Sequence, residues 1–226
     1  MNSRFRKQLL LIALPATMIL QALGQGTFQN LDFEQADPIP LLGSPYYPYE
    51  VATTNGLPGW TAYIGGNPVD RVLYNDVGLD APSISLVDSL NPFFQPIQGS
   101  YSVYLKWSNP FYPPVYTTAI GQTGQLPNDA LSLRFLSAPR GGVLVSFGGQ
   151  NIPFVQFGTS GNNIIIAEYI SRFAGQTGEL LFLGNNLLFD DIQFSNQAIP
   201  EPSVIGLSLI CGLLLGWRRW RNSSRP

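Results

Sequence analysis

Histidine is absent from this chain of 226 residues, and the one cysteine, Cys211, stands in an apolar stretch near the C-terminus. The absence of histidine excludes Ser-His-Asp and Cys-His nucleophilic catalysis, and it removes the usual ligands of zinc sites. The interior of the chain has no thiol and so can form no disulfide. Its stability must come from its core, with a metal ion as the one additional aid we consider.

Charge is also scarce, because charged residues make up only 12% of the chain against 45% hydrophobic residues. This composition excludes disorder, while 23 glycines and 19 prolines favour many turns between short strands. Between Gln25 and Ile199 stand five basic and thirteen acidic residues, a formal charge of −8. An acidic domain repels phosphate backbones, so we expect no nucleic-acid partner.

The first 24 residues predict a secretory signal peptide. Three basic residues, Arg4, Arg6 and Lys7, precede an apolar stretch, and the small residues Ala22 and Gly24 mark a cleavage site. We therefore expect export through the secretion translocon, with cleavage after Gly24. The alternative interpretation is a membrane anchor that is retained.

The C-terminus carries a short apolar segment with a basic end. Residues 203–217 hold no charge, and as a helix of about 1.5 Å per residue they span less than the roughly 30 Å hydrocarbon core. Trp217 and Trp220 suit the membrane interface, and the arginines that follow stay on the cytoplasmic side. The sequence thus predicts a short transmembrane helix. Its length makes it a weak permanent anchor and suits a transient one.

This arrangement resembles the PEP-CTERM sorting signal over residues 199–221, ahead of a tail at 222–226. The motif is carried by Pro200, Glu201, Pro202, Arg218, Arg219 and Arg221. The resemblance implies processing by an exosortase, a membrane protease of Gram-negative bacteria that make extracellular polysaccharide. It also implies a protein that is transiently membrane-anchored and then resides in the cell envelope or outside the cell. The alternative is an ordinary tail anchor with an accidental Pro-Glu-Pro.

Residues 25–198 show the period-2 alternation of an all-β domain. Nine or ten short strands separated by Gly/Pro turns predict a β-sandwich or jelly roll, and the missing crossover helices disfavour parallel α/β folds. The repeated Gly-Gln-Thr-Gly at 121–124 and 175–178 predicts two similar turns. We expect strands at 28–33, 60–64, 84–86, 101–107, 116–122, 131–135, 143–147, 164–169, 179–183 and 187–194.

The two ends of this domain resemble those of galactose-binding-like jelly rolls. The similarity lies in Asn30–Glu34 followed by Pro58-Gly59-Trp60, and in the closing run from Ile170 to Ile192. The resemblance implies that the first and last strands lie close together, and many members bind a structural Ca²⁺ there.

Alternation also places Asp190 on one face with Leu188, Ile192 and Phe194. If that face is the core, the carboxylate needs a partner. One candidate is Ca²⁺, with Glu34 as a second ligand and Asp32 as a further oxygen donor. The alternative is a carboxylate satisfied by backbone amides, with Asp191 in solvent.

Aromatic residues suggest a platform on which a sugar could stack. Its members are Tyr46, Tyr47, Trp60, Tyr63 and Tyr112, with Tyr49 and Phe111 in the wider set and Asn67, Asp70 and Asn75 as hydrogen-bonding partners. The alternative places Trp60 in the core and the loop tyrosines over a sandwich edge. We expect no enzyme and no catalytic residue, because no pair of acids has the distinctive context of a glycosidase. The sequence favours a structural matrix component, with a module that binds extracellular polysaccharide as the second hypothesis.

Overall fold

A computed structural model describes residues 25–43, 49–78, 81–108, 116–138, 141–160 and 163–197. The predicted signal peptide at 1–24, the sorting segment at 199–221 and the tail at 222–226 lie outside these residues. In the part of the chain that is described, no helix is long and apolar enough to span a bilayer.

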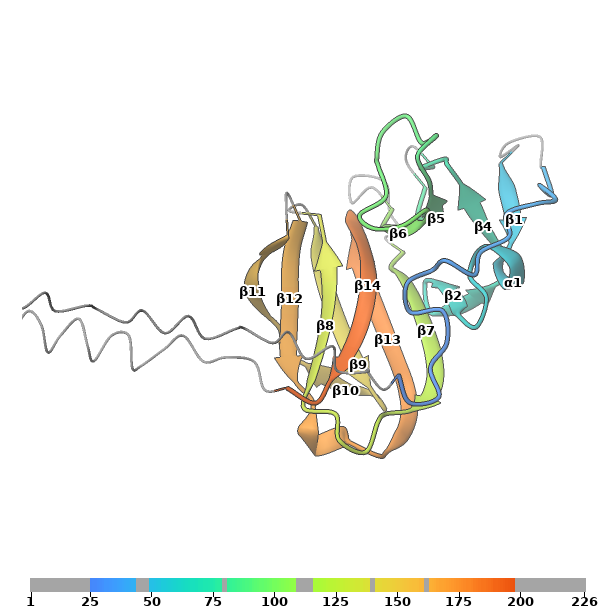
Figure 1. Cartoon of the computed structure of the whole chain (residues 1–226). Helices are drawn as coiled ribbons and strands as arrows, with labels where there is room; N and C mark the ends of the chain where they lie inside the picture. Colours follow the sequence, from blue (N-terminus) through green and yellow to red (C-terminus); the bar gives the residue numbers. More distant parts are fainter. Residues whose placement is uncertain are drawn as a thin grey trace, which may run out of the picture.

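The described residues form two β-sheets that face each other as a sandwich (Figure 1). Eight strands make the first sheet, in the order β1-β4-β5-β6-β14-β8-β12-β11, and six make the second, in the order β10-β9-β13-β7-β2-β3. The first sheet contains β1 (Glu50–Ala52), β4 (Arg71–Tyr74), β5 (Ser83–Val87), β6 (Ser102–Lys106), β8 (Ser132–Ser137), β11 (Val155–Ser160), β12 (Asn163–Tyr169) and β14 (Leu187–Ser195). The second contains β2 (Thr61–Ile64), β3 (Asn67–Val69), β7 (Thr118–Gln125), β9 (Gly142–Phe147), β10 (Gln150–Ile152) and β13 (Thr177–Asn185).

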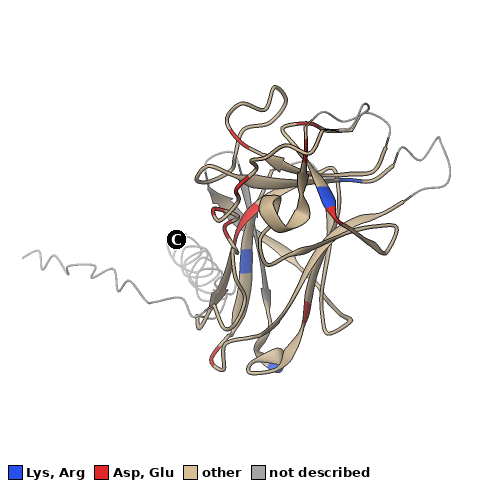
Figure 2. Cartoon of the chain, turned by 90° about the vertical axis from the view of Figure 1, so that its right-hand side faces the viewer, with Lys and Arg blue, Asp and Glu red and all other residues tan. Residues whose placement is uncertain are grey.

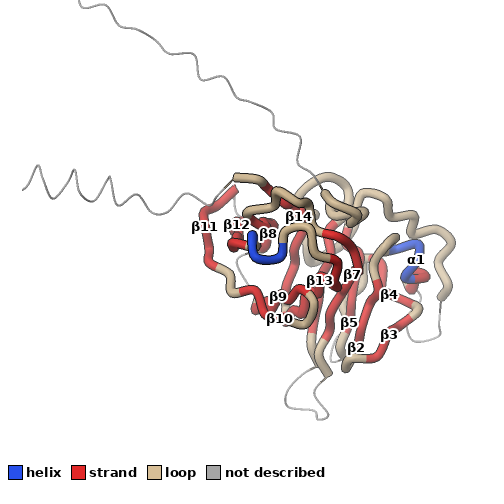
Figure 3. The backbone as a smooth tube through the Cα atoms, turned by 90° about the horizontal axis from the view of Figure 1, so that it is seen from below, coloured by secondary structure: helices blue, strands red, loops and turns tan. Residues whose placement is uncertain are grey.

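The main core lies between the two sheets, which form separate layers when the molecule is seen from below (Figure 3). Its centre is a cluster of aromatic rings. Phe182 of β13 stacks on Phe189 of β14 with ring centroids 5.1 Å apart, and Phe135 of β8 meets both rings edge-on. Contacts between rings on facing sheets hold the sandwich together through apolar burial and edge-to-face geometry.

The prediction of an all-β sandwich is confirmed, and nine of the expected strands overlap strands of the structure. The additional strands β1, β3, β4 and β10 have three or four residues, too short to show alternation, and β11 was also missed. The described helical elements are the turns α1 (Thr53–Gly56) and η1 (Ser171–Phe173). The pairing is antiparallel except between β4 and β5, which run parallel with residues 75–82 connecting them.

The strand expected at 28–33 is wrong. Its side chains Phe28, Leu31 and Phe33 are buried as the alternation suggests, but Asn30 and Phe33 have φ angles of 50° and 58°. This left-handed backbone breaks an extended chain into turns. The segment still lies beside the last strand, because the amide of Ile192 donates to the carbonyl of Leu31 at 3.0 Å.

The Gly-Gln-Thr-Gly at 121–124 is also wrong as a turn, because it lies inside β7. Gly124 there pairs with Gly178 of the second copy, which enters β13 after a turn. Gly124 lies directly under the ring of Phe28, and a Cβ there would meet that ring at 2.9 Å. Glycine is thus needed here for close packing between chain segments. In the sequence, a glycine needed for packing looks the same as a glycine needed for a turn.

A second, smaller core lies on the outer face of the eight-stranded sheet. The connection 88–101 between β5 and β6, the green segment at the top of Figure 1, folds back over this face. It covers Val87, Tyr104 and Leu188, and the ring of Phe94 rests 4.5 Å from that of Tyr104. Both faces of β5 and β6 are therefore buried, whereas simple alternation would leave one in solvent.

Asp190 belongs to this second core and not to the first. β14 has an irregularity between Asp190 and Gln193, and Asp191 has a φ of 52°. The extra residue of such a bulge shifts the alternation. Leu188 and Asp190 therefore face the connection 88–101, while Ile192 and Phe194 face the main core. The sequence correctly predicts that Asp190 is buried, but the face that it assigns is wrong.

Candidate functional site

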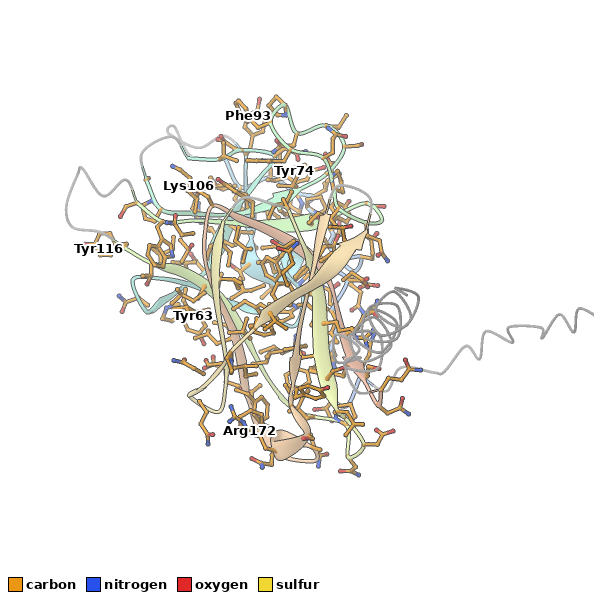
Figure 4. All side chains as sticks on the ribbon, turned by 90° about the vertical axis from the view of Figure 1, so that its left-hand side faces the viewer. Tyr63, Tyr74, Phe93, Lys106, Tyr116 and Arg172 are labelled. Atoms are coloured by element: carbon orange, nitrogen blue, oxygen red, sulfur yellow. The ribbon has the colours of Figure 1, made fainter. Side chains whose placement is uncertain are left out.

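The largest pocket that we describe has a volume of about 370 Å³ and opens at the end of the molecule that carries the connection 88–101. Its lining is mostly apolar and comes from Leu41, Tyr49, Tyr74, Asn75, Leu90 and Pro92. Figure 4 shows Tyr74 and Phe93 at this upper end, whereas Arg172 lies at the opposite end. We call it the end pocket.

The pairing of β1 with β4 positions the two tyrosines. Glu50 pairs with Leu73, and one residue further on the amide of Tyr74 donates to the carbonyl of Tyr49 at 2.7 Å. Residues opposite each other on antiparallel strands point to the same face, with Cβ atoms about 5 Å apart. The ring of Tyr49 is 52% exposed, so it offers an open aromatic surface beside the half-buried Tyr74.

The parallel pairing of β4 with β5 positions the polar groups of the pocket. Because parallel strands end at the same edge of a sheet, Asn75 after β4 and Asp88 after β5 lie side by side. Asn75 has a φ of 53°, a conformation that asparagine tolerates, and it turns the chain there. Nδ2 of Asn75 donates to Oδ1 of Asp88 at 2.6 Å, and the backbone amide of Asp88 donates to Oδ1 of Asn75 at 2.9 Å.

The Asp88 carboxylate gathers further donors. Its Oδ2 accepts the hydroxyl of Tyr74, and its Oδ1 accepts the amide of Leu90 at 2.7 Å. Charge-assisted hydrogen bonds of this kind are stronger than neutral ones. The network therefore fixes both the phenol of Tyr74 and the start of the connection 88–101, so the polar side of the pocket is held in one arrangement.

Carboxylates act on the tyrosines at this end of the molecule. Burial raises the pKa of Tyr74, and the hydrogen bond to the Asp88 carboxylate raises it further, so its hydroxyl stays protonated. Burial also raises the pKa of Tyr101, with added contributions from the charges of Asp88, Glu34 and Asp37. Figure 2 shows acidic positions in the upper part of the molecule, where basic positions lie as well.

The structure brings together only part of the predicted aromatic platform. Tyr49 and Asn75, from the wider predicted set, meet in the end pocket. Tyr46, Tyr47 and Tyr112 lie outside the described residues. Trp60 is 5% exposed, its Nε1 donates to the carbonyl of Asn30 at 3.0 Å, and its ring packs against Phe33 and Phe182. Its assignment to a sugar platform is corrected, because Trp60 is a core residue.

Tyr63 lies on the outer face of the six-stranded sheet, away from the end pocket (Figure 4). It borders a shallow pocket of about 230 Å³ with Ala119, Leu181 and Leu183, and its hydroxyl donates to Oε1 of Glu179 at 2.9 Å. Glu179 reaches Tyr63 across Gly121, where a Cβ would meet Oε1 at 2.7 Å. This second pocket has one aromatic wall and a carboxylate that is already bonded.

The predicted calcium ligands Glu34 and Asp190 approach the same connection, residues 88–101, from two sides. Asp190 is 0% exposed, and it accepts the amide of Asp191 at 2.6 Å, the Ser102 hydroxyl at 2.7 Å and the amide of Gln98 at 3.2 Å. Oε1 of Glu34 accepts the amides of Ser100 and Tyr101 at 2.7 and 3.0 Å.

These contacts are those of the alternative, in which amides satisfy the inward carboxylate. A cation placed among amide donors would face their positive ends, so the described oxygens do not fit Ca²⁺ well. Among the described residues, no group of three or more acidic, cysteine or histidine side chains gathers to hold a metal. Calcium binding is not tested by these contacts, which match the alternative of a carboxylate satisfied by amides.

Sequence reasoning missed Tyr74, Asp88 and Leu90. The one available signal was the sequence Val87-Asp88-Ser89, which follows the predicted strand at 84–86 and reads as a turn. The position of Asp88 beside Tyr74 depends on a parallel pair without a crossover helix. Such a pair is too rare to expect from sequence.

No protein-family model matches the chain, and no curated protein matches it in sequence. Two solved structures are similar to it. One is TmCBM61 in complex with β-1,4-galactotriose, at 13% identity and a TM-score of 0.35, covering 77% of this chain and 100% of the other. The second is the family 11 carbohydrate-binding module of Clostridium thermocellum in complex with a β-1,3-1,4-mixed-linked tetrasaccharide, at 11% identity and a TM-score of 0.34, covering 68% of this chain and 97% of the other. Similarity at this level does not identify a ligand for this chain.

Proposed function

We propose that this protein is exported and that its β-sandwich binds carbohydrate in the end pocket. The observation that carries the proposal is the pair Tyr49 and Tyr74 beside the hydrogen-bonded Asn75 and Asp88. Sugars present C–H faces to aromatic rings and hydroxyl groups to amides and carboxylates. A ligand without hydroxyl groups would leave the polar side of the pocket unused.

The pocket favours this binding role over a purely structural one. Its volume of about 370 Å³ lies within the usual range of ligand sites, and its polar groups are held in place by their own network. Leu90 at its rim is 79% exposed, and Phe93 nearby is 64% exposed. Exposed apolar side chains that gather beside a pocket mark an interaction site more often than an inert surface.

The test is binding of the full chain to a panel of bacterial and plant polysaccharides by affinity electrophoresis. The full chain carries the apolar segment 203–217 and therefore needs a detergent to stay in solution. The detergent should be a polyoxyethylene one, because the sugar headgroup of an alkyl glycoside could itself occupy the pocket. We expect Tyr49→Ala to weaken binding about tenfold, the loss typical of an aromatic anchor. Tyr116→Ala is the matched control, because Tyr116 is 44% exposed and does not line the end pocket. Equal losses in both variants would contradict the assignment of the site.

We also propose that the sandwich is a galactose-binding-like jelly roll. The position of the mature start supports this, because Phe28 packs on Phe194 of the last strand with centroids 5.3 Å apart. The amide of Ile192 in that strand donates to Leu31. The first and last segments of the domain thus lie together, as the resemblance implies.

We propose, finally, that Pro200-Glu201-Pro202, the apolar segment 203–217 and the terminal arginines form a PEP-CTERM-type sorting signal. The order of these parts in the sequence supports the proposal. An exosortase-type protease would remove the segment and release the domain to the cell envelope or the extracellular matrix. Intact mass spectrometry of the mature protein tests it, in cells with and without the processing enzyme. Recovery of the complete C-terminus in both strains would contradict the proposal.

A further inference from the structure

We propose that the end pocket selects glycans built from uncharged sugars and rejects polymers of uronic acids, an inference that rests on the carbohydrate-binding function proposed above. Extracellular polysaccharides include both classes. The difference between them is a carboxylate in place of a primary hydroxyl group, and the pocket distinguishes these two groups through its charge and its hydrogen bonds.

The described lining of the pocket is uncharged, and the charge next to it is that of Asp88. This lining contains no lysine or arginine, and Asp88 lies directly behind Tyr74 and Asn75. The basic residues Arg71 and Lys106 contact other groups. Arg71 pairs with Glu50 at 3.2 Å, and the Lys106 ammonium donates to the carbonyl of Gly78 at 2.6 Å. A ligand carboxylate would therefore meet no cation among the described residues that line the pocket.

The hydrogen-bonding capacity of Tyr74 and Asp88 points the same way, although the Tyr49 hydroxyl and the second N–H of Asn75 can still donate. Tyr74 donates its one hydroxyl proton to Asp88, so the remaining capacity of its oxygen is to accept. Asp88 is an acceptor only, and its oxygens hold three donors where a carboxylate can take about four. A sugar hydroxyl can donate to these oxygens. A uronate carboxylate has no proton to give and would place its lone pairs against those of Tyr74 and Asp88.

The acids around Tyr101 extend this field beyond the pocket. Glu34, Asp37 and Asp88 all act on the Tyr101 hydroxyl, so three carboxylates share this end of the molecule. Two unit charges of like sign a few ångströms apart in a partly solvated site repel enough to weaken binding about tenfold, and salt screens the effect. Discrimination against uronates should therefore be large at low salt and shrink in about 1 M salt, where the Debye length is about 3 Å.

The experiment compares each polysaccharide with its own oxidised form, in which C6 hydroxyl groups are converted to carboxylates. Binding of the full chain is measured by isothermal titration calorimetry at pH 7, in low and in high salt. We expect the oxidised polymers to bind about tenfold more weakly than their parents at low salt, with a smaller difference at high salt. Equal or tighter binding of the oxidised forms overturns the inference while the carbohydrate-binding function stands. Failure of every parent and every oxidised polymer to bind overturns the proposed function.

Two variants separate the local charge from the overall acidity of the domain. Asp88→Asn removes the negative charge behind the pocket, and Asp129→Asn removes one from an exposed position bonded to Asn196, distant from the pocket lining. Both change the net charge equally. We expect Asp88→Asn alone to narrow the ratio between parent and oxidised polymer. Equal narrowing in both variants assigns the discrimination to overall charge and overturns the inference. If Asp88→Asn fails to fold, the wild-type protein provides the test. A ratio of parent to oxidised polymer affinity that does not change with salt would then overturn the inference.

Discussion

Replacement of Asp190 by asparagine should remove a pH dependence of stability that one buried carboxylate creates. Burial under the connection 88–101 raises the pKa of Asp190 from 3.8 to about 7, although hydrogen bonds from Ser102, Asp191 and Gln98 act in the opposite direction. The carboxyl group is thus harder to ionise in the folded protein than in the unfolded chain.

The direction of the effect follows from proton binding. Between about pH 4 and pH 7 the folded protein holds a proton on Asp190 that the unfolded chain has lost. The free energy of unfolding therefore falls as the pH rises through this window, and it is level above it. A shift of about three pH units at about 1.4 kcal/mol each gives about 4 kcal/mol for the full fall, as an order of magnitude.

Asparagine keeps the shape of the side chain and does not titrate. Its amide group can donate to the Ser102 hydroxyl, but it loses the hydrogen bond from the amide of Gln98, at a cost of about 1 kcal/mol. We expect Asp190→Asn to be more stable than the wild type at pH 8. At pH 5 the difference should vanish or reverse.

The assay is urea denaturation followed by tryptophan fluorescence from pH 4.5 to 8, with the free energy obtained by linear extrapolation. Asp129→Asn is the matched control, because Asp129 is exposed and bonded to Asn196, whereas the charge of Asp191 itself raises the pKa of Asp190. The free energy of unfolding of wild type and of Asp129→Asn should fall with the same slope as the pH rises. An equally steep slope in Asp190→Asn would refute the reasoning.

Three further predictions concern the core, the connection 88–101 and the metal. Phe182→Ala should lower the free energy of unfolding by about 3–5 kcal/mol in urea denaturation, because the ring is fully buried against Trp60, Phe135 and Phe189. The control Leu144→Ala, at a 59% exposed position, should change it by less than about 0.5 kcal/mol. Glu34→Gln should speed hydrogen exchange at the amides of Ser100 and Tyr101 measured by mass spectrometry, with Asp32→Asn as the control, and unchanged protection there would show that Glu34 does not hold the connection. Millimolar Ca²⁺ should leave the melting temperature unchanged, because amides already bind the Asp190 carboxylate; a rise that Asp190→Ala abolishes would establish the metal site instead.

The layered fold could be predicted from the sequence because its central strands alternate. β6, β8, β9 and β13 each place apolar residues at every second position toward the core, as Leu180 and Phe182 do. The segment 28–33 shows the limit of this signal. Its residues are buried at nearly the right spacing, but two left-handed residues make it a series of turns.

Asp190 shows a second limit. The sequence identified an inward carboxylate, and the structure confirms its complete burial. The bulge at Asp190–Gln193 changes the sheet face to which the following side chains point. No residue type in the strand indicates this bulge, because the positive φ is taken by Asp191 and not by a glycine. The carboxylate of Asp190 is covered by residues 97–102, which supply the Gln98 amide and the Ser102 hydroxyl. These residues are about 90 positions away in the chain, so the contact could not be inferred from the sequence.

The end pocket was only partly predictable for a similar reason. Tyr49 and Asn75 could be named as an exposed aromatic residue and a polar residue in turns, but their meeting depends on strand pairing. β1 and β4 are short strands at one end of the eight-stranded sheet, without an alternation pattern of their own. Asp88, which organises the site, becomes a neighbour of Tyr74 only through the parallel pairing of β4 with β5.

The central claim is that sugar binds in the end pocket. The most direct test is a two-dimensional ¹H–¹⁵N NMR titration of the isotope-labelled protein with an oligosaccharide cut from a polymer that it binds. Saturable shifts should concentrate on the side-chain amide of Asn75 and on the backbone amides of Tyr49, Tyr74 and Leu90. Shifts concentrated instead around Tyr63 and Glu179 on the sheet face, with the end pocket unchanged, would contradict the account.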